Sequence, residues 1–245
     1  MGFLPHNQTR PPLPVPAPII RPLRMVGVSF YEVPVAVTRE RILEVAPDAA
    51  PYVDDLLKQM RDSAITTDIR AAHFLGQVFV ESMGFARTTE NLNYSVQALK
   101  TLFGRRISDA DAEKFGRRKG NPANPSAIAN LIYGGEWGRE NLGNTVPGDG
   151  YRFRGRGLKQ LTGRDNYERF SRAWLGSDAL LAQPGQVSEP AGAVASAIWF
   201  WHNKGLNAVA DRNSVEQVTR IVNGGSNGLE ERREMTQKFL KAFSA

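Results

Sequence analysis

The chain has 245 residues, of which 41% are hydrophobic and 23% charged, as is usual for a globular protein. It has no cysteine, which excludes disulfide bonds and thiolate metal sites, and its three histidines form no HxxxH pair, which argues against a zinc hydrolase. No apolar run reaches the ~18 residues that a membrane-spanning helix needs. The net charge of +6 favours polyanionic partners, such as nucleic acid or the anionic polymers of a cell envelope.

The first 24 residues are rich in proline. Seven prolines and three arginines disfavour helix and sheet there and favour extended polyproline-II geometry. We interpret residues 1–24 as a flexible basic tail, with a cationic arm that contacts the cell envelope as the alternative. The segment also lacks the unbroken apolar stretch of a secretory signal, so an extracellular target would require another route of delivery.

Helical patterns begin at about residue 37. Thr38 is placed to cap the first helix, and Thr67 or Asp68 begins another that runs from Ile69 to Ser82 with a wide apolar face. The other predicted helices are 52–60, 92–103, 109–115, 126–133, 166–175, 190–204, 214–222 and 229–243. Strand signals are weak and confined to 150–153 and 158–162. The sequence therefore predicts a mainly α domain with a small β element.

The stretch 118–157 is rich in Gly, Pro and Asn, and only 126–133 has a helical pattern in it. A loop region of that length inside a compact domain usually carries function. We expect residues 25–64 to form the N-terminal helical part of the same domain as 65–245, which contains the motifs below.

Glu81 lies near the end of the predicted 69–82 helix. His73, Gln77 and Glu81 are spaced four residues apart and so lie along one side of it. The rest of the helix is largely apolar, so we expect Glu81 at the edge of a core, where desolvation raises the pKa of a carboxyl. A raised pKa suits a general acid near neutral pH. The alternative is a structural glutamate that pairs with a nearby arginine such as Arg87.

Glu90 follows nine residues later, in a polar loop. A helix that ends at Glu81 and a short return loop can place Glu90 across a cleft, where a partly solvated carboxylate stays ionised and can activate water. Inverting glycosidases hold their two carboxyls ~6.5–9.5 Å apart and retaining ones ~5–5.5 Å apart. Two glutamates at this spacing are by themselves a weak signal.

Two further segments present polar side chains among glycines. In residues 151–163, Gln160 and Thr162 lie on the same side of an extended chain, and the arginines suit anionic or polyhydroxyl ligands. Asn223 precedes Gly224-Gly225, which by itself indicates only a helix stop, but its amide can serve a sugar N-acetyl group or a water. The aromatic run 199–202 is best interpreted as core, although one tryptophan could reach the cleft.

In this order, the motifs resemble those of the family-19 glycoside hydrolases, most closely the phage endolysins and bacterial chitinase-like enzymes of that family. The resemblance covers roughly residues 65–240. It is carried by Glu81-Ser82, Glu90-Asn91-Leu92-Asn93-Tyr94-Ser95, the segment 151–163 continuing to Asn166-Tyr167, and Asn223-Gly224-Gly225.

The resemblance implies a lysozyme-like helical domain with two lobes and a deep cleft. Glu81 would be the general acid and Glu90 the general base of an inverting hydrolysis that uses neither metal nor cofactor. Thr162 would help to hold the water, and Arg232 would pair with the acidic site residues. The implied substrate-binding positions are Gln160, Asn166, Asn223 and, within the Glu90 motif, Tyr94.

Three departures favour a compact bacterial or phage-type member. Val80 stands where plant members usually carry His, the plant-type disulfides are impossible, and the long loops between the two glutamates are missing. We therefore expect an endolysin that cleaves β-1,4 bonds between the N-acetylated sugars of bacterial peptidoglycan. It would act as a monomer, bind the anionic envelope through its basic surface and need no obligate protein partner.

The lack of a secretory signal suits an enzyme that accumulates in the host cytoplasm until a holin opens the membrane. Two other functions stay open at this point. One is a chitinase acting on N-acetylglucosamine polymers. The other is a non-catalytic cationic protein that binds glycan or nucleic acid.

Overall fold

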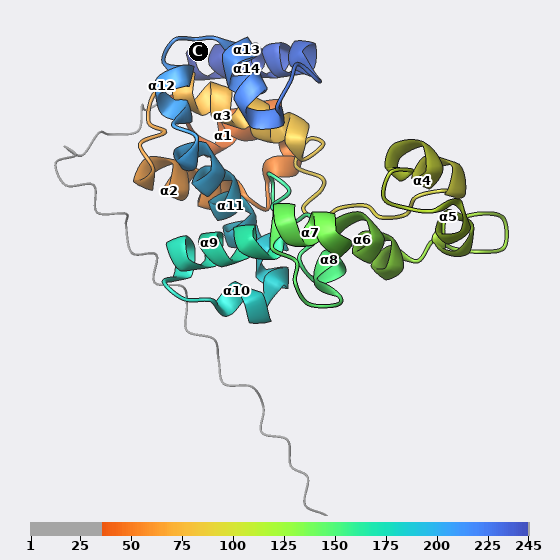
Figure 1. Ribbon diagram of the computed structural model, residues 1–245. Coiled ribbons are helices and arrows are strands. Elements are labelled where there is room, and N and C mark those ends of the chain that lie inside the picture. The colour runs from red at the N-terminus through yellow and green to blue at the C-terminus, as the bar shows by residue number, and fades with distance from the viewer. Residues whose placement is uncertain (1–35, 245) are drawn as a thin grey trace, which may run out of the picture.

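The computed structural model describes residues 36–244, so the predicted tail 1–24 lies outside the described residues. Within this range the protein is helical and contains no β-strand, which confirms the mainly α class (Figure 1). The site depends on α3 (Asp68–Glu81), α11 (Pro190–Asn203), α13 (Val215–Asn223) and α14 (Leu229–Ser244). The other elements are α1 (Arg39–Val45), η1 (Pro47–Ala49), α2 (Val53–Asp62), α4 (Val96–Phe103), α5 (Asp109–Phe115), α6 (Pro125–Tyr133), α7 (Gly135–Leu142), α8 (Asp149–Arg152), α9 (Arg164–Leu175), α10 (Ala179–Ala182), η2 (Pro184–Ser188) and α12 (Leu206–Ala210).

Both predicted helix caps are present. The side chain of Thr38 accepts a hydrogen bond from the backbone N–H of Arg41, and that of Thr67 accepts one from Arg70. Each hydroxyl thereby satisfies one of the N–H groups that a helix leaves unpaired in its first turn. The Thr67 cap thereby sets the start of α3 at Asp68, and the helix then runs to Glu81.

The two strand predictions are wrong. Residues 149–152 form the short helix α8, and residues 158–162 form a turn in which Arg156 and Leu161 make an isolated backbone pair. The expected β element is therefore reduced, within residues 36–244, to single bridges such as this one and Thr89–Arg156. Alternation over four or five residues cannot distinguish such a folded turn from a strand, because tertiary contacts decide which backbone groups pair.

The loop predicted at 118–157 also contains the helix α7, which the sequence pattern did not indicate. Gly135 and Gly138 lower the helical propensity of this stretch. The fold requires the second of them, because a Cβ at Gly138 would lie 1.9 Å from the carbonyl oxygen of Tyr133. Close packing between the end of α6 and α7 therefore requires glycine at position 138. The same glycine weakens the helical pattern of the sequence there.

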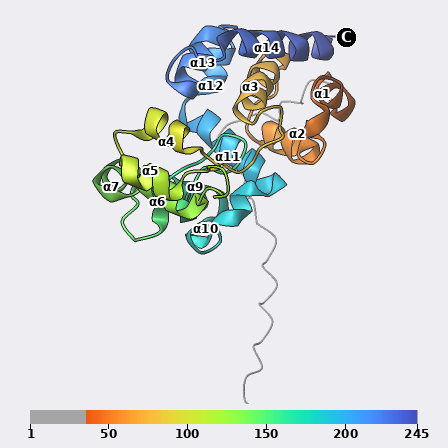
Figure 2. The same ribbon diagram turned by 90° about the vertical axis from the view of Figure 1, so that its right-hand side faces the viewer.

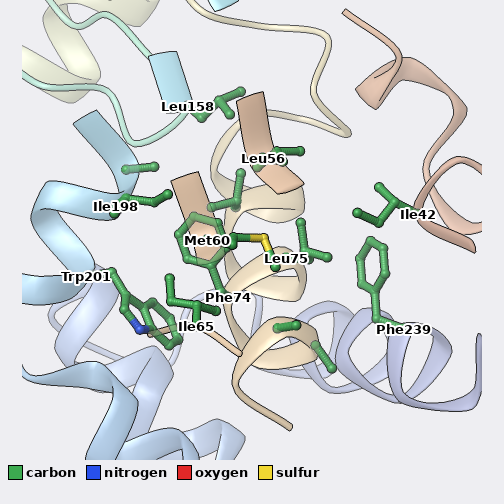
Figure 3. Packing of buried hydrophobic residues seen from close by; sticks show 14 of the residues in the cluster. Ile42, Leu56, Met60, Ile65, Phe74, Leu75, Leu158, Ile198, Trp201 and Phe239 are labelled. Carbon is green, nitrogen blue, oxygen red and sulfur yellow. The ribbon is translucent and has the colours of Figure 1, made fainter. Parts of the chain in front are cut away.

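The largest core lies between α3 and the helices around it. Phe74 and Leu75 of α3 are fully buried, together with Ile42 of α1 and Phe239 of α14, and the Phe74 ring meets Trp201 edge-on (Figure 3). Each fully buried side chain of this size contributes ~1.5–3 kcal/mol. Helices α1 and α2 thus pack into the same core as α3. The domain boundaries expected at residues 25–64 and 65–245 stay a prediction.

Two smaller cores complete the described part of the chain. One joins α4, α5 and α6, which lie to the right of the main body in Figure 1 and face the viewer in Figure 2. The other surrounds Phe153, Tyr167 and Phe170 and joins α9 and α10 to α11. The chain between Glu81 and α4 leads from the main core to the α4–α6 lobe, so Glu90 lies on the connection between the two.

Gly76 sets the distance between α3 and α14. A Cβ at this position would lie 2.6 Å from the Thr236 hydroxyl and 3.0 Å from its backbone nitrogen, so only glycine permits the observed approach. Glu81 lies five residues after Gly76 on α3, and Arg232 lies four residues before Thr236 on α14. The close approach of the two backbones therefore brings Arg232 to the end of α3 that carries Glu81.

Candidate active site

Glu81 is bound by two cations. The guanidinium of Arg232 donates to Oε1 at 2.6 Å, and the ammonium of Lys159 donates to Oε2 at 2.8 Å. The Glu81 side chain is 14% exposed, so solvent screens these contacts only partly. Glu81 thus lies at the edge of the core, and its carboxylate is paired with an arginine, but this arginine is Arg232 and not the nearby Arg87. The expected pairing of Arg232 with an acidic site residue is present in the structure.

His73, Gln77 and Glu81 form a row of polar side chains on the side of α3 that faces α13 and α14. Arg232 also donates to Oε1 of Gln77 at 2.5 Å, and the amide of Gln77 donates to Thr219 of α13 at 3.2 Å. His73, one turn further back, is paired with Asn213 at 3.0 Å, and burial lowers the pKa of its imidazole. These contacts fix the side of α3 from which Glu81 projects.

Glu90 is held by donors of a different kind. The Tyr133 hydroxyl donates to its Oε1 at 2.5 Å, and the backbone N–H of Gly155 donates to its Oε2 at 3.3 Å. Burial, together with the charge of Glu90, raises the pKa of Tyr133, so its hydroxyl stays a neutral donor. Glu90 as a residue is half-buried, so it is not fully shielded from water.

The segment 151–163 contacts both carboxylates. Gly155 exchanges two hydrogen bonds with Glu90, one to its backbone and one to its side chain, while Lys159 binds Glu81. Gly155 and Lys159 are four residues apart, so their Cα atoms lie no more than ~14 Å apart even in a fully extended chain. A turn closed by Gln160 N–H to Gly157 O shortens this span further. The two glutamates are therefore positioned by one short loop.

Hydrogen bonds connect the predicted polar residues Gln160 and Thr162 of this loop to Asn166 in α9. The Thr162 hydroxyl donates to the carbonyl of Gln160 at 2.9 Å, and the amide of Asn166 donates to the carbonyl of Thr162 at 2.8 Å. Gln160 has a left-handed backbone with φ of 55°, which costs a non-glycine residue ~1–2 kcal/mol. A Cβ on Gly155 would lie 2.9 Å from Gln160 Oε1, so glycine there lets this amide lie beside Glu90.

Asn223 and Tyr94 contact different parts of this arrangement. The amide of Asn223 donates to the carbonyl of Asn227 at 2.7 Å, and that carbonyl also accepts from Arg232. Tyr94 packs edge-on against Phe103, and burial, together with the nearby charge of Glu90, raises the pKa of its hydroxyl. Asn223 is thus linked to the Glu81 side of the site and Tyr94 to the Glu90 side. Roles in substrate binding for both residues stay predictions.

Sequence reasoning missed Lys159 and Tyr133 as partners of the two acids. Lys159 lies inside a motif that the sequence singled out, but no spacing rule indicates that its side chain turns toward α3. Tyr133 ends a helix more than forty residues from Glu90, so only the tertiary fold reveals the contact. Of the aromatic run 199–202, it is Phe200 and not a tryptophan that borders the site, with its ring centroid 4.8 Å from Lys159 Nζ.

A helical domain in which one polar loop contacts two separately held carboxylates is the arrangement expected of a lysozyme-like glycoside hydrolase. A Haemophilus influenzae protein described as a glycosyl hydrolase family 19 domain-containing protein is 41% identical over 183 residues, which are 74% of this chain and 84% of that protein. The chain therefore belongs to glycosyl hydrolase family 19, and the resemblance inferred from its motifs is confirmed.

Solved structures show the same fold. Chitinase C from Streptomyces griseus aligns with a TM-score of 0.53 at 18% identity, over 86% of this chain and 77% of that one. A bacterial family 19 chitinase aligns with a TM-score of 0.51 at 16% identity, over 86% of this chain and 96% of that one. No family model matches the chain. No helix in the described range is long and apolar enough to cross a membrane, and no cluster of three His, Asp or Glu side chains there could hold a metal ion.

Proposed function

We propose that the protein is an endolysin-type hydrolase that cleaves β-1,4 bonds between the N-acetylated sugars of bacterial peptidoglycan. Glu81 acts as the general acid and Glu90 as the general base of a single-displacement, inverting reaction. The observation that carries the proposal is the segment 151–163, which binds Glu90 through Gly155 and Glu81 through Lys159.

The environments of the two glutamates suit these different roles. Arg232 stabilises the negative charge that Glu81 gains when it gives its proton to the glycosidic oxygen. Glu90 is half-buried, and the donors recorded for its carboxylate in the described part of the chain, Tyr133 and Gly155, are neutral, so it can accept a proton from a water. Thr162 helps to hold that water, and Gln160, Asn166, Asn223 and Tyr94 contact the sugars.

The biological part of the proposal is lysis of a bacterial host. The net charge of +6 suits an anionic cell envelope, to which a basic protein binds by long-range attraction. We expect the enzyme to accumulate in the host cytoplasm and to reach the wall when a holin opens the membrane. It would work as a monomer, and it needs no cofactor for acid–base hydrolysis.

A chitinase is the second candidate, because both similar solved structures are chitinases. Chitin and peptidoglycan share the N-acetyl group that the polar side chains of the loop would bind. The substrates differ in charge, since the muramic acid and peptide groups of peptidoglycan carry carboxylates and chitin is neutral.

Product analysis distinguishes these functions. Purified peptidoglycan and soluble chitin oligomers are each digested with the parent, Glu81→Gln and Glu90→Gln, and the products are identified by mass spectrometry. Each substitution should lower kcat by ~10²–10⁴-fold, the usual contribution of a positioned acid or base. Glu234→Gln is the matched control, because this glutamate on α14 is exposed and its recorded ion pair among residues 36–244 is with Lys238 on the surface of the same helix.

The ends of the products identify the bond. Products that end in reducing N-acetylmuramic acid indicate a muramidase, and those that end in reducing N-acetylglucosamine indicate a glucosaminidase. Anhydro ends would instead indicate a lytic transglycosylase, and hydrolysis would then be wrong. Cleavage of chitin oligomers alone would replace the peptidoglycan proposal by the chitinase. If the parent released no product from either polymer, the enzymatic proposal would be wrong and a binding protein would be favoured.

A further inference from the structure

Lys159 is an unexpected partner of the acid. Its Nζ lies 2.8 Å from Glu81 Oε2 and 4.8 Å from the centre of the Phe200 ring, and its side chain is 18% exposed. The family resemblance assigned no role to this position. Two cations therefore bind one carboxyl, one on each oxygen.

The two cations are held very differently. Arg232 is 3% exposed and donates to Gln77 and to the carbonyl of Asn227 as well as to Glu81, so its planar head is fixed. Lys159 has a flexible four-carbon stem, and its recorded partners are Glu81 and the face of Phe200. An aromatic face attracts an ammonium without fixing its direction. Lys159 is thus the cation that can leave Glu81.

Each oxygen of the Glu81 carboxyl accepts from one cation. Arg232 from α14 donates to Oε1 and Lys159 from the loop donates to Oε2, and these are the charged groups recorded on this carboxyl among the described residues. A general acid needs one oxygen free to present its proton to the glycosidic oxygen. Departure of Lys159 from Oε2 would free that oxygen for the substrate.

We propose that Lys159 makes the enzyme selective for glycans that carry carboxylates. A carboxylate of the bound substrate draws the ammonium away from Glu81, while Arg232 keeps the acid in position. A neutral glycan leaves Lys159 on Glu81 Oε2, where it blocks that oxygen. The inference rests on the proposed function and adds a residue that distinguishes peptidoglycan from chitin; Lys159 is a positioning residue, since it acts through Glu81.

The test compares three soluble substrates: peptidoglycan fragments with free carboxylates, the same fragments with the carboxylates amidated, and chitin oligomers. Parent kcat/KM should be at least ~10-fold higher for the free than for the amidated fragments, the effect of losing one good charged contact. In Lys159→Met this preference should disappear. On chitin oligomers the same variant should also have a higher kcat than the parent and a changed pH profile, because Oε2 of Glu81 is then free; a merely structural role would not cause this.

Lys204→Met is the matched control, because Lys204 lies over the same Phe200 ring at 6.0 Å and is exposed. It removes one positive charge nearby, and no contact with Glu81 is recorded for it in the described range. Lys204→Met should keep both the substrate preference and the pH profile of the parent. Melting temperatures show that the variants are folded, and the comparison of free and amidated fragments on the parent needs no variant.

The outcomes separate the two proposals. A parent that cleaves all three substrates with no preference for free carboxylates would overturn the selectivity and leave the hydrolase intact. So would a Lys159→Met variant with the preference and pH profile of Lys204→Met. A parent inactive on every substrate would overturn the proposed function, and the role of Lys159 with it.

Discussion

Arg232 provides the strictest test of how the acid is held. Substitution by methionine keeps most of the side-chain volume but removes the charge and the donors to Glu81, Gln77 and Asn227. Loss of one partner of a buried ion pair usually costs ~3–5 kcal/mol, because the other charge is left uncompensated. Glu81 is 14% exposed and keeps Lys159, so we expect a loss at the lower end, about 3 kcal/mol.

Chemical and thermal unfolding measure this loss. For a chain of this size, about 3 kcal/mol lowers the melting temperature by roughly 6–12 °C. Arg233→Met is the matched control on the same helix. Arg233 has a 42% exposed side chain and pairs with Glu230 and Glu216 at the surface, so its loss should cost no more than ~1 kcal/mol.

A double-mutant cycle with Glu81→Gln isolates the pair itself. The combined variant should be at least ~0.5 kcal/mol more stable than the sum of the two single changes implies, because the residues share one contact. If Arg232→Met were no less stable than Arg233→Met, or if the cycle gave no coupling, the reasoning from burial and the hydrogen-bond network would be refuted.

Two further predictions concern Glu90 and α3. Tyr133→Phe removes the hydroxyl that orients Glu90 Oε1 and should lower kcat by roughly 10–100-fold with little change in KM, measured by steady-state kinetics; an unchanged kcat would exclude an orienting role. Burial lowers the pKa of His73 in the folded protein. Below the ordinary histidine pKa of ~6.5, the unfolded chain therefore binds a proton at His73 that the folded protein does not bind. The free energy of unfolding should therefore fall as the pH drops from ~6.5 to ~5, and urea titrations should show a shallower slope in His73→Gln; equal slopes would contradict the assignment.

The helices could be predicted wherever local chemistry decides them. Thr67 caps α3 and its apolar face is read directly from the residues, so the position of Glu81 at the end of that helix was correct. The strands predicted at 150–153 and 158–162 failed because the segment 151–163 folds against Glu90 and α11, and long-range contacts choose its backbone pairs. Gly157 shows this dependence, since a Cβ there would lie 2.3 Å from the Ser196 hydroxyl of α11.

The sequence by itself determined the helical class, the two glutamates and their order relative to the polar loop, because periodicity, caps and motif spacing are local properties. The tertiary structure alone decided what surrounds each carboxylate. Lys159 and Arg232 reach Glu81 from segments 78 and 151 residues away, and Tyr133 reaches Glu90 across 43 residues. Charge and hydrogen bonding act over a few ångströms in space, so the chemistry of each acid depends on neighbours that the chain brings together only when it folds.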